Sequence, residues 1–386
     1  MTTGETAPAR VREQVPLAGY TTLGLGGPAA RFIEALTDDQ AVAAVRDADG
    51  SGEPVLVLGG GSNLVVADDG FPGTVVRLAT TGVRTAADGA GVVITAAAGE
   101  DWDTLVERCV AEGLSGIECL SGIPGLAGAT PIQNVGAYGQ EVAESVVTVR
   151  AYDRVLDSVV ELASADCGFG YRTSVFKRHA TAASRAGSGR RGALEPVAAT
   201  GRWVVLGVTY RLVRDQLSAP VRYGELARAV GVSEGDRVPL GDARSAVLEL
   251  RRRKGMVLDP ADPDTASAGS FFINPVLDPG QFAELRRRVA ARSGEPGQDA
   301  AVPNFPADDG RLKVPAAWLI EQAGFTKGHP GNGGARISSK HTLALVNPGG
   351  ASAAAVIGLA RQIRDGVRQA FGVELIPEPV LVGAVL

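Results

Sequence analysis

The chain has 386 residues, of which 45% are hydrophobic and 21% are charged, and its formal net charge is −5. This length allows two or three domains, because a single hydrophobic core rarely grows beyond about 250–300 residues. The mild negative charge argues against a nucleic-acid partner, and no apolar run approaches the ~18 residues of a membrane span.

The first compact unit is predicted to have a β-α-β order. RFIEAL is strand-like, and Thr37 with Gln40 has the capping-box spacing that begins a helix. The helix is expected over residues 41–48, and the continuous apolar run PVLVL then predicts a buried strand. The loop GGGSN, residues 59–63, follows directly from the end of this strand.

The middle of the chain changes to short strands, first VVRL and then VVITAAAG. A helix is expected after Asp101, with apolar side chains on one face and Gly113 at its C-terminal end. Residues 120–139 contain too many glycines and prolines for regular structure, and strands are expected again at VVTVRAYD and RWVVLGVTYRLV. Between these strands, residues 180–201 lack periodicity, which predicts an exposed, mobile insertion.

A third unit is predicted from about Leu217. Helices are expected at DARSAVLELRRRKGM, beginning at Asp242, at residues 279–292, at AAWLIEQAG and at residues 352–371. HTLALVN is expected to be a strand, and the tail GVELIPEPVLVGAVL returns as another. No internal repeat is evident.

The GGGSN loop has the composition of an anion-binding site. Successive glycines let backbone N–H groups converge on an anion without hindrance from Cβ atoms, and Ser62 and Asn63 add polar side chains. The loop is neither GxGxxG nor a Walker motif, which disfavours the two commonest nucleotide-binding folds. An ordinary tight turn explains this motif equally well. The second glycine-rich segment, residues 122–139, is a candidate for another wall of an extended ligand site.

Three residues elsewhere are candidates for charge and proton chemistry. They are Arg172 in YRTSVFK, Ser270 beside two phenylalanines in GSFFINP, and Glu378 between two prolines that exclude a helix. Each also has an ordinary explanation: Arg172 as an exposed strand residue, Ser270 as a turn residue, and Glu378 as part of a surface turn. The basic run of residues 251–254 is either a diphosphate clamp or the solvated last turn of a helix, where cations are favoured.

Metal and hydrolytic sites are poorly supported. The three cysteines stand far apart without a CxxC pair, and the three histidines are scattered, so we predict no metal site and no disulfide framework. No GxSxG elbow occurs, which disfavours a serine hydrolase. Without an apolar secretory core near its N-terminus, the chain is predicted to be a reduced, cytoplasmic protein.

The order and content of these motifs resemble the UDP-N-acetylenolpyruvoylglucosamine reductase family, flavoenzymes of peptidoglycan precursor synthesis. The resemblance covers nearly the whole chain and is carried by TTLGLGG, GGGSNL, SGIPGLAGATPIQNVGAYG, YRTSVFK, RYGEL, RRRKGMVLDP, AGSFFINP, AAWLIEQAGFTKG and the closing PEP. RYGEL is similar to a tyrosine loop of the longer, type I members. The chain departs from many relatives after Lys254, where GMVL replaces a shorter Leu-Pro run.

The resemblance implies an α+β fold with a two-subdomain FAD-binding domain of the vanillyl-alcohol-oxidase (PCMH) type and a C-terminal α+β substrate-binding domain. We place the two FAD-binding subdomains at residues 1–80 and 81–216. The substrate-binding domain is expected at residues 217–371, and residues 372–386 as a C-terminal strand that returns to the active site.

The resemblance also implies the chemistry. FAD is the expected cofactor, NADPH the reductant, and the sugar nucleotide UDP-N-acetylglucosamine enolpyruvate the substrate that is reduced to UDP-N-acetylmuramate. Roles in cell-wall biogenesis, cell shape and cell division would follow. The implied catalytic residues are Arg172, Ser270 as the proton donor, and Glu378. The implied flavin-binding residues are Gly59, Gly60, Gly61, Ser62, Asn63, Leu64, Ile123, Gly128, Ala129, Thr130, Gln133 and Gly136. The implied substrate-binding residues are Tyr138, Tyr223, Lys254, Asn274 and Gln322.

Two alternatives remain open at this point. One is an FAD-dependent oxidase of a hydroxy acid or sugar on the same cofactor fold, although many such oxidases attach FAD through a histidine near the glycine loop, and here no histidine precedes His179. The other is a catalytically inactive protein that senses UDP-sugars. The sequence does not indicate an oligomeric state.

Overall fold

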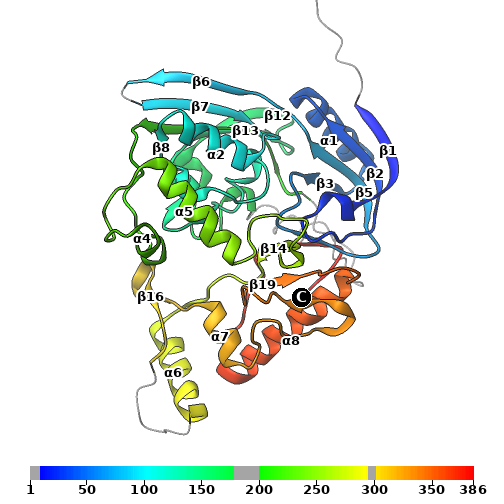
Figure 1. The fold of residues 1–386 in the computed structure, drawn as a ribbon. Helices are drawn as coiled ribbons and strands as arrows, with labels where there is room; N and C mark the ends of the chain where they lie inside the picture. Colours follow the sequence, from blue (N-terminus) through cyan, green and yellow to red (C-terminus); the bar gives the residue numbers. More distant parts are fainter. Residues whose placement is uncertain (1–8, 90, 178–199, 294–300) are drawn as a thin grey trace, which may run out of the picture.

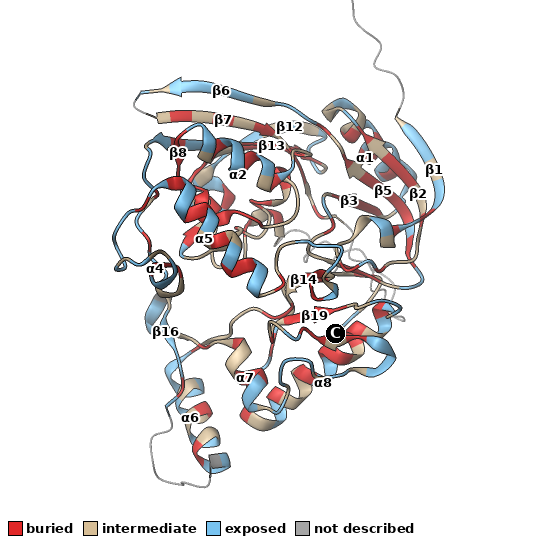
Figure 2. Ribbon diagram, in the orientation of Figure 1, coloured by how far each residue is buried: buried red, intermediate tan, exposed pale blue. Residues whose placement is uncertain are grey.

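The computed structural model describes residues 9–89, 91–177, 200–293 and 301–386. Most of the insertion expected at residues 180–201 therefore lies outside the described residues. Two sheet-containing parts, coloured blue and cyan to green, lie side by side in Figure 1, and a third, mostly yellow to red, lies below them. Buried residues line the inner faces of the helices and sheets in all three parts (Figure 2).

The first part has the predicted β-α-β order. Its sheet has the order β1-β2-β5-β3, made of β1 (Arg10–Pro16), β2 (Pro28–Ala35), β5 (Phe71–Leu78) and β3 (Val55–Leu58). Helix α1 (Asp38–Ser51) is longer than expected at both ends, and the Thr37 side chain caps it by accepting the Gln40 N–H at 3.2 Å. Its alanines and Val45 pack against β2 and β5. The short strand β4 (Leu64–Val66) follows the glycine loop.

The second part is built on a larger antiparallel sheet. Its order is β12-β11-β13-β7-β6, made of β12 (Ser158–Ala163), β11 (Val146–Asp153), β13 (Trp203–Arg214), β7 (Gly91–Ala97) and β6 (Val83–Asp88), and β8 (Leu114–Ser115) pairs with β13. Helix α2 (Trp102–Ala111) begins after Asp101 as predicted and buries the expected apolar face in this part's core. The sequence analysis missed β12 and β6, because both are largely exposed edge strands without a continuous apolar run.

Helices α4 (Gly224–Val230) and α5 (Leu240–Arg253) follow β13. The prediction that α5 begins at Asp242 was wrong by two residues, because Pro239 is the N-cap and Leu240 already has helical geometry. The buried faces of both helices share a hydrophobic cluster with Cys119, and α5 also contacts α2. The 3-10 turn Glu118–Leu120 contacts both α5 and α2. Helix α5 therefore packs directly on the second part of the molecule.

The third part is mixed α and β. Its sheets have the orders β14-β19-β18 and β15-β17-β16, made of β14 (Ser267–Ser270), β19 (Ala344–Val346), β18 (Arg336–Ile337), β15 (Val276–Leu277), β17 (Leu312–Lys313) and β16 (Phe305–Pro306). The predicted helices are confirmed as α6 (Pro279–Ser293), α7 (Ala316–Gln322) and α8 (Ala353–Phe371). The strands in HTLALVN and in the tail are shorter than expected.

The tail crosses back to the first part of the molecule. Strand β20 (Val380–Val382) runs parallel to β4, with Val380 opposite Leu64. A small hairpin of β9 (Gly136–Ala137) and β10 (Gln140–Glu141) lies in the second glycine-rich segment, which is otherwise irregular as predicted. Of the helices that could be traced in the described ranges, none is both long and apolar enough to cross a membrane.

Candidate active site

One cavity of about 260 Å³ lies where the glycine loop, the second glycine-rich segment, β14 and the C-terminal tail meet. It brings together residues that are more than 300 positions apart in the sequence. Of the residues predicted from the sequence, those that line it are Gly59, Gly60, Gly61, Ser62, Asn63, Leu64, Ile123, Ala129, Thr130, Gln133, Gly136, Arg172, Ser270 and Glu378. The cavity therefore joins the predicted flavin-binding loops to all three predicted catalytic residues.

Backbone contacts fix the shape of the glycine loop. Gly61 has a φ of +62°, and a Cβ atom there would lie 1.9 Å from the carbonyl oxygen of Tyr20. A Cβ atom on Gly60 would lie 2.7 Å from the Cα atom of Gly125, in the second glycine-rich segment. The two segments thus approach closely only because both positions lack a side chain.

We expect Gly60→Ala to weaken FAD binding about tenfold or more, because the added methyl group must push the two segments apart. The matched control is Gly50→Ala in α1, where a Cβ atom would meet nothing within 4 Å. This control should leave FAD binding unchanged. Titrating FAD into each purified variant and measuring the dissociation constant checks the prediction, and equal affinities for the two variants would contradict it.

The tail holds Glu378 at the cavity through main-chain hydrogen bonds. The N–H of Glu378 donates to the carbonyl oxygen of Phe271 at 2.9 Å, and the N–H of Val380 donates to that of Asn63 at 2.9 Å. The Asn63 side chain donates from Nδ2 to Gln133 Oε1 at 2.9 Å and to the Glu378 carbonyl at 3.4 Å. Residues from the glycine loop, β14 and the tail are therefore positioned as one unit.

Arg172 lies against the same tail. Its backbone is in the left-handed region, with φ of +53°, and its Nη2 donates to the carbonyl oxygen of Gly136 at 2.7 Å. Its Nε lies 3.3 Å from Glu378 Oε1. The guanidinium is therefore anchored on one side by β9 and faces the Glu378 carboxyl on the other.

Burial dominates the electrostatics of this group. It raises the pKa of Glu378, and the nearby cations Arg172 and Lys177 oppose that shift without cancelling it. Burial also lowers the pKa of Lys177, whose Nζ donates to the Glu378 carbonyl oxygen at 3.3 Å. Both pKa shifts show that burial disfavours the charged form of each side chain, the carboxylate of Glu378 and the ammonium of Lys177.

Ser270 is the last residue of β14 and pairs with Ala344 of β19. Phe271 and Phe272, which follow it, are each 1% exposed and pack edge to face. These two anchors fix the end of the strand beside the cavity.

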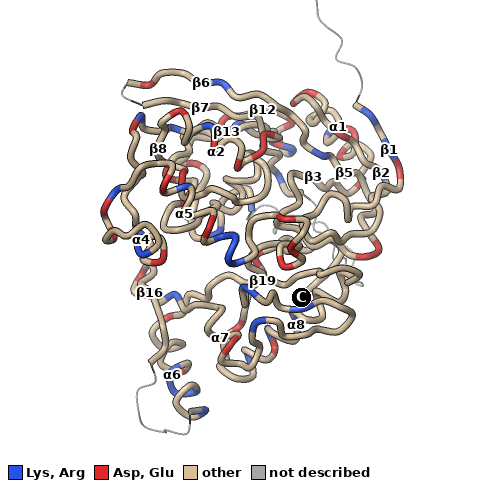
Figure 3. The backbone as a smooth tube through the Cα atoms, in the orientation of Figure 1, with Lys and Arg blue, Asp and Glu red and all other residues tan. Residues whose placement is uncertain are grey.

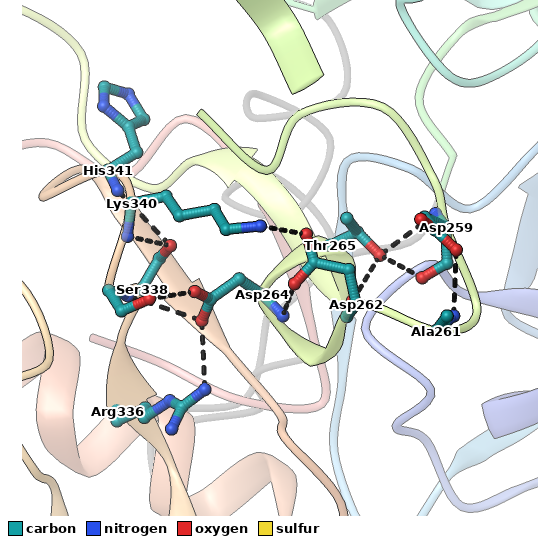
Figure 4. A network of polar contacts seen from close by, with 10 residues as sticks. Asp259, Ala261, Asp262, Asp264, Thr265, Arg336, Ser338, Lys340 and His341 are labelled. Atoms are coloured by element: carbon teal, nitrogen blue, oxygen red, sulfur yellow. Dashed lines mark hydrogen bonds and ion pairs between the residues drawn. The ribbon is translucent and has the colours of Figure 1, made fainter. Parts of the chain in front are cut away.

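A polar network holds the turn that precedes β14 (Figure 4). The buried Asp264 accepts hydrogen bonds from Arg336 Nη2 at 3.1 Å and from the Ser339 hydroxyl. Asp262, two residues before Asp264, forms an ion pair with Lys340. These contacts therefore hold the turn before β14 against residues 336–340, which precede β19. Strand β19 is the strand that pairs with β14.

Three of the predicted substrate-binding residues form a cluster beside the cavity. Lys254 Nζ lies 5.4 Å from the centre of the Tyr138 ring and 2.5 Å from Glu225 Oε2. The Tyr138 and Tyr223 rings pack edge to face, with centres 5.6 Å apart. Burial raises the pKa of Tyr138 to about 12.

Three predicted residues lie apart from these groups. Asn274 accepts the Ala316 N–H at the beginning of α7 and lines a second cavity of about 1150 Å³ together with Tyr171. Gln322 is exposed at the end of α7 and lines neither cavity. Gly128 is buried away from the cavity, where its N–H donates to the Ala98 carbonyl oxygen at 3.0 Å.

The sequence analysis gave no role to Lys177 and Met256, which line the first cavity, and considered Arg251, which also lines it, only as part of a possible diphosphate clamp. Lys177 was visible as the last residue of YRTSVFK, and Arg251 as the first of a basic run. Helical spacing distinguishes Arg251 from its solvated neighbours, because it lies four residues after Val247, on the buried face of α5.

Comparisons with known proteins agree with this geometry. Residues 29–159 match the FAD binding domain family, and residues 260–382 match the family described as UDP-N-acetylenolpyruvoylglucosamine reductase, C-terminal domain. The chain is 55% identical to the UDP-N-acetylenolpyruvoylglucosamine reductase of Thermobifida fusca, over 96% of this chain and 98% of that protein. It is 53% identical to the protein of the same name from Streptomyces coelicolor, over 99% and 94% of the two chains.

A solved structure is similar along the whole length. The crystal structure of the UDP-N-acetylenolpyruvylglucosamine reductase from Thermus caldophilus superposes with a TM-score of 0.61 at 26% identity, over 97% of this chain and 99% of that one. The predicted α+β fold, with an FAD-binding domain and a separate C-terminal domain, is thereby confirmed. The chain belongs to the UDP-N-acetylenolpyruvoylglucosamine reductase family.

Proposed function

We propose that this chain reduces UDP-N-acetylglucosamine enolpyruvate to UDP-N-acetylmuramate, with FAD as its bound cofactor and NADPH as the reductant. One observation carries the assignment of the site: Arg172, Ser270 and Glu378 line the same cavity as the glycine loop. The family shared with the relatives supports the reaction and favours it over the alternative of an oxidase.

The residues present fit FAD. The backbone of residues 59–63 comes directly off the end of β3 and lines the cavity, where its N–H groups suit a pyrophosphate. Apolar side chains of Val57, Leu126 and Ile132 line other parts of it, and Arg251 adds a buried cation. The chemistry that bound FAD supplies is the delivery of a hydride from NADPH to C3 of the substrate's vinyl group.

Arg172 is proposed to stabilise the charge that develops on the substrate. Bond formation at C3 leaves an electron pair at C2, delocalised onto the substrate carboxylate. Because the guanidinium is already anchored by Gly136, it can face this charge without reorganising. Lys177, which also lines the cavity, is a second cationic group beside Glu378.

Ser270 is proposed to protonate C2. A serine hydroxyl is a weak acid, but a carbanion-like centre is a strong base, so the transfer is feasible when the hydroxyl lies within hydrogen-bond reach. The buried phenylalanines after Ser270 and the β14–β19 pairing keep the position of its backbone constant during the step.

Glu378 is proposed to act in its protonated form, as a hydrogen-bond donor to the substrate carboxylate. An ionised carboxylate at this position would repel the substrate. Burial raises the pKa of Glu378, so the protonated form persists to a higher pH than for an exposed glutamate.

A pH profile tests this role. The rate at which substrate reoxidises the reduced enzyme should fall as pH rises through the raised pKa of Glu378, since the acid is then lost. The glutamine of Glu378→Gln cannot ionise. This variant should keep part of the reoxidation rate, but its rate should no longer fall as pH rises through that range. Glu374→Gln, an exposed glutamate four residues earlier, should keep the wild-type profile. A limb that survives in Glu378→Gln would contradict the protonated role.

The sugar nucleotide is proposed to contact Tyr138, Tyr223, Lys254, Asn274 and Gln322. The cluster of Tyr138, Tyr223 and Lys254 beside the cavity supports part of this site. The division of the chain at residues 80, 216 and 371 also stays a proposal, as do the cytoplasmic location and roles in cell-wall biogenesis, cell shape and cell division.

The decisive experiment uses the purified protein. It should be yellow, oxidise NADPH only when the enolpyruvyl sugar nucleotide is added, and react slowly with oxygen. A colourless protein that does not take up FAD would refute the proposal. Rapid reaction of the reduced protein with oxygen, together with no turnover of the sugar nucleotide, would favour an oxidase.

A further inference from the structure

The segment between β1 and β2 contacts two of the elements that border the first cavity, and it has no role in the function proposed above. Residues 17–30 contain no Asp, Glu, Lys or Arg, so the whole stretch is tan in Figure 3. Leu23 and Leu25 of this segment are buried in the hydrophobic core of the third part. The segment is therefore anchored there by apolar packing and hydrogen bonds, without charged side chains of its own.

Thr22 lies in this segment and makes a hydrogen bond to each of the two elements. Its N–H donates to the carbonyl oxygen of Gly61, in the glycine loop, at 3.2 Å. Its hydroxyl donates to the carbonyl oxygen of Ser267, the first residue of β14, at 2.6 Å. Thr22 thus joins the loop proposed to hold FAD to the strand that ends in Ser270. Thr22 itself lines neither of the two cavities described above, so it does not contact a ligand there.

Strand β14 is irregular between its first and last residues. Ser267 lies opposite Val346 and Ser270 opposite Ala344, so β14 advances three residues where β19 advances two. The extra residue forms a β-bulge, a feature that re-aims side chains beside active sites. Because a bulge interrupts the regular pairing of the strands, the position of Ser270 depends on how the beginning of the bulge is held. The hydroxyl of Thr22 holds it at Ser267.

The C-terminal tail joins the same two elements on the other side of the bulge. The Glu378 N–H donates to the carbonyl oxygen of Phe271, just after the bulge, and the Val380 N–H donates to that of Asn63, in the glycine loop. The main chain of the tail makes both of these bonds. The hydroxyl of Thr22 is a side-chain contact, which a substitution removes while the main-chain bonds stay in place.

The reaction requires a fixed separation between the glycine loop and β14. C2 and C3 of the substrate's vinyl group are adjacent carbons: C3 receives the hydride with its two electrons, and the electron pair left at C2 takes the proton of Ser270. Proton transfer requires hydrogen-bond distance, and a misplacement of about 1 Å can cost about 10²-fold in rate. We propose that Thr22 sets the position of Ser270 relative to bound FAD and is a positioning residue for reoxidation. This inference rests on the proposed function.

The test is Thr22→Val, which replaces the hydroxyl with a methyl group of similar size. It should slow reoxidation by the enolpyruvyl sugar nucleotide about tenfold or more. Reduction by NADPH and the dissociation constant of FAD should not change, because the N–H bond to Gly61 is kept. The matched control is Thr74→Val in β5, which removes the bond from a buried hydroxyl to Glu53 Oε2 at 2.8 Å and should change neither half-reaction.

A double variant separates this role from a structural one. If Thr22 acts through Ser270, adding Thr22→Val to Ser270→Ala should slow reoxidation no further. Slowing by the same factor with and without the Ser270 hydroxyl would overturn the proposal. The solvent deuterium isotope effect on reoxidation should also rise in Thr22→Val, because transfer of the hydroxyl proton then limits the rate more strongly. An unchanged isotope effect in a slowed variant would overturn the proposal as well.

Thr22→Ser keeps the hydroxyl and should keep the wild-type rate of reoxidation, so equal slowing in Thr22→Ser and Thr22→Val would contradict the proposal. Should Thr22→Val not fold, Thr22→Ala leaves room for a water at the Ser267 carbonyl and gives the same comparison. A lower unfolding temperature with both half-reactions unchanged would show that the hydrogen bond only stabilises the fold, and would overturn the proposal. A failure of the proposed function is distinct, because the wild-type protein would then lack bound FAD or NADPH oxidation.

Discussion

Ser270→Ala should leave the reduction of bound FAD by NADPH nearly intact and slow its reoxidation by the enolpyruvyl sugar nucleotide by about 10²–10⁴-fold, the range typical of a lost general acid. Only the second half-reaction requires a proton at C2 of the substrate. The hydroxyl lies at the end of β14, in the cavity that also contains Arg172 and Glu378. Rapid mixing, with the flavin absorbance as signal, measures the two half-reactions separately.

The matched variant is Ser270→Thr, which keeps a hydroxyl group on a β-branched side chain suited to a strand. It should recover part of the reoxidation rate. Equal slowing of both half-reactions in Ser270→Ala would show that the residue positions the flavin or shapes the cavity, and the proton-donor assignment would then be wrong.

Arg172→Gln should slow reoxidation by about 10²–10³-fold, the loss usually seen when one preorganised group that stabilises developing charge is removed. Glutamine keeps hydrogen-bonding capacity but has no charge for the electron pair that collects at C2. The same rapid-mixing experiment measures the effect, with FAD reduction by NADPH as the internal reference.

Two further variants define what Arg172 contributes. Arg172→Lys keeps the charge but cannot reproduce the fork that contacts the Gly136 carbonyl and faces Glu378, so its rate should lie between those of the wild type and Arg172→Gln. Arg211→Gln removes an exposed arginine paired with Asp88 and should change neither half-reaction. Wild-type reoxidation in Arg172→Gln would exclude a role in charge stabilisation.

Regular elements with strong patterns were predictable from the sequence. The apolar faces of α2 and α8, the buried run of β3 and the Thr37 cap of α1 all depend on neighbours a few residues away. The motifs and their order also sufficed to identify the family, which the comparisons confirm. Exposed edge strands such as β6 were not predictable, because tertiary pairing decides them. The beginning of α5 was missed because the prediction treated Asp242 as the first residue of the helix, whereas the N-cap is Pro239.

The sequence by itself determined which residue types are available for chemistry: a glycine loop after a buried strand, an arginine, a serine and a prolyl-flanked glutamate. Only the tertiary structure decided that they share one cavity, because Glu378 reaches it through the Phe271 hydrogen bond and the β20–β4 pairing, across more than 300 residues of chain. It also decided that the buried face of α5, which includes Arg251, borders this cavity. Local patterns report the period of a helix, whereas long-range packing chooses the face that meets the ligand.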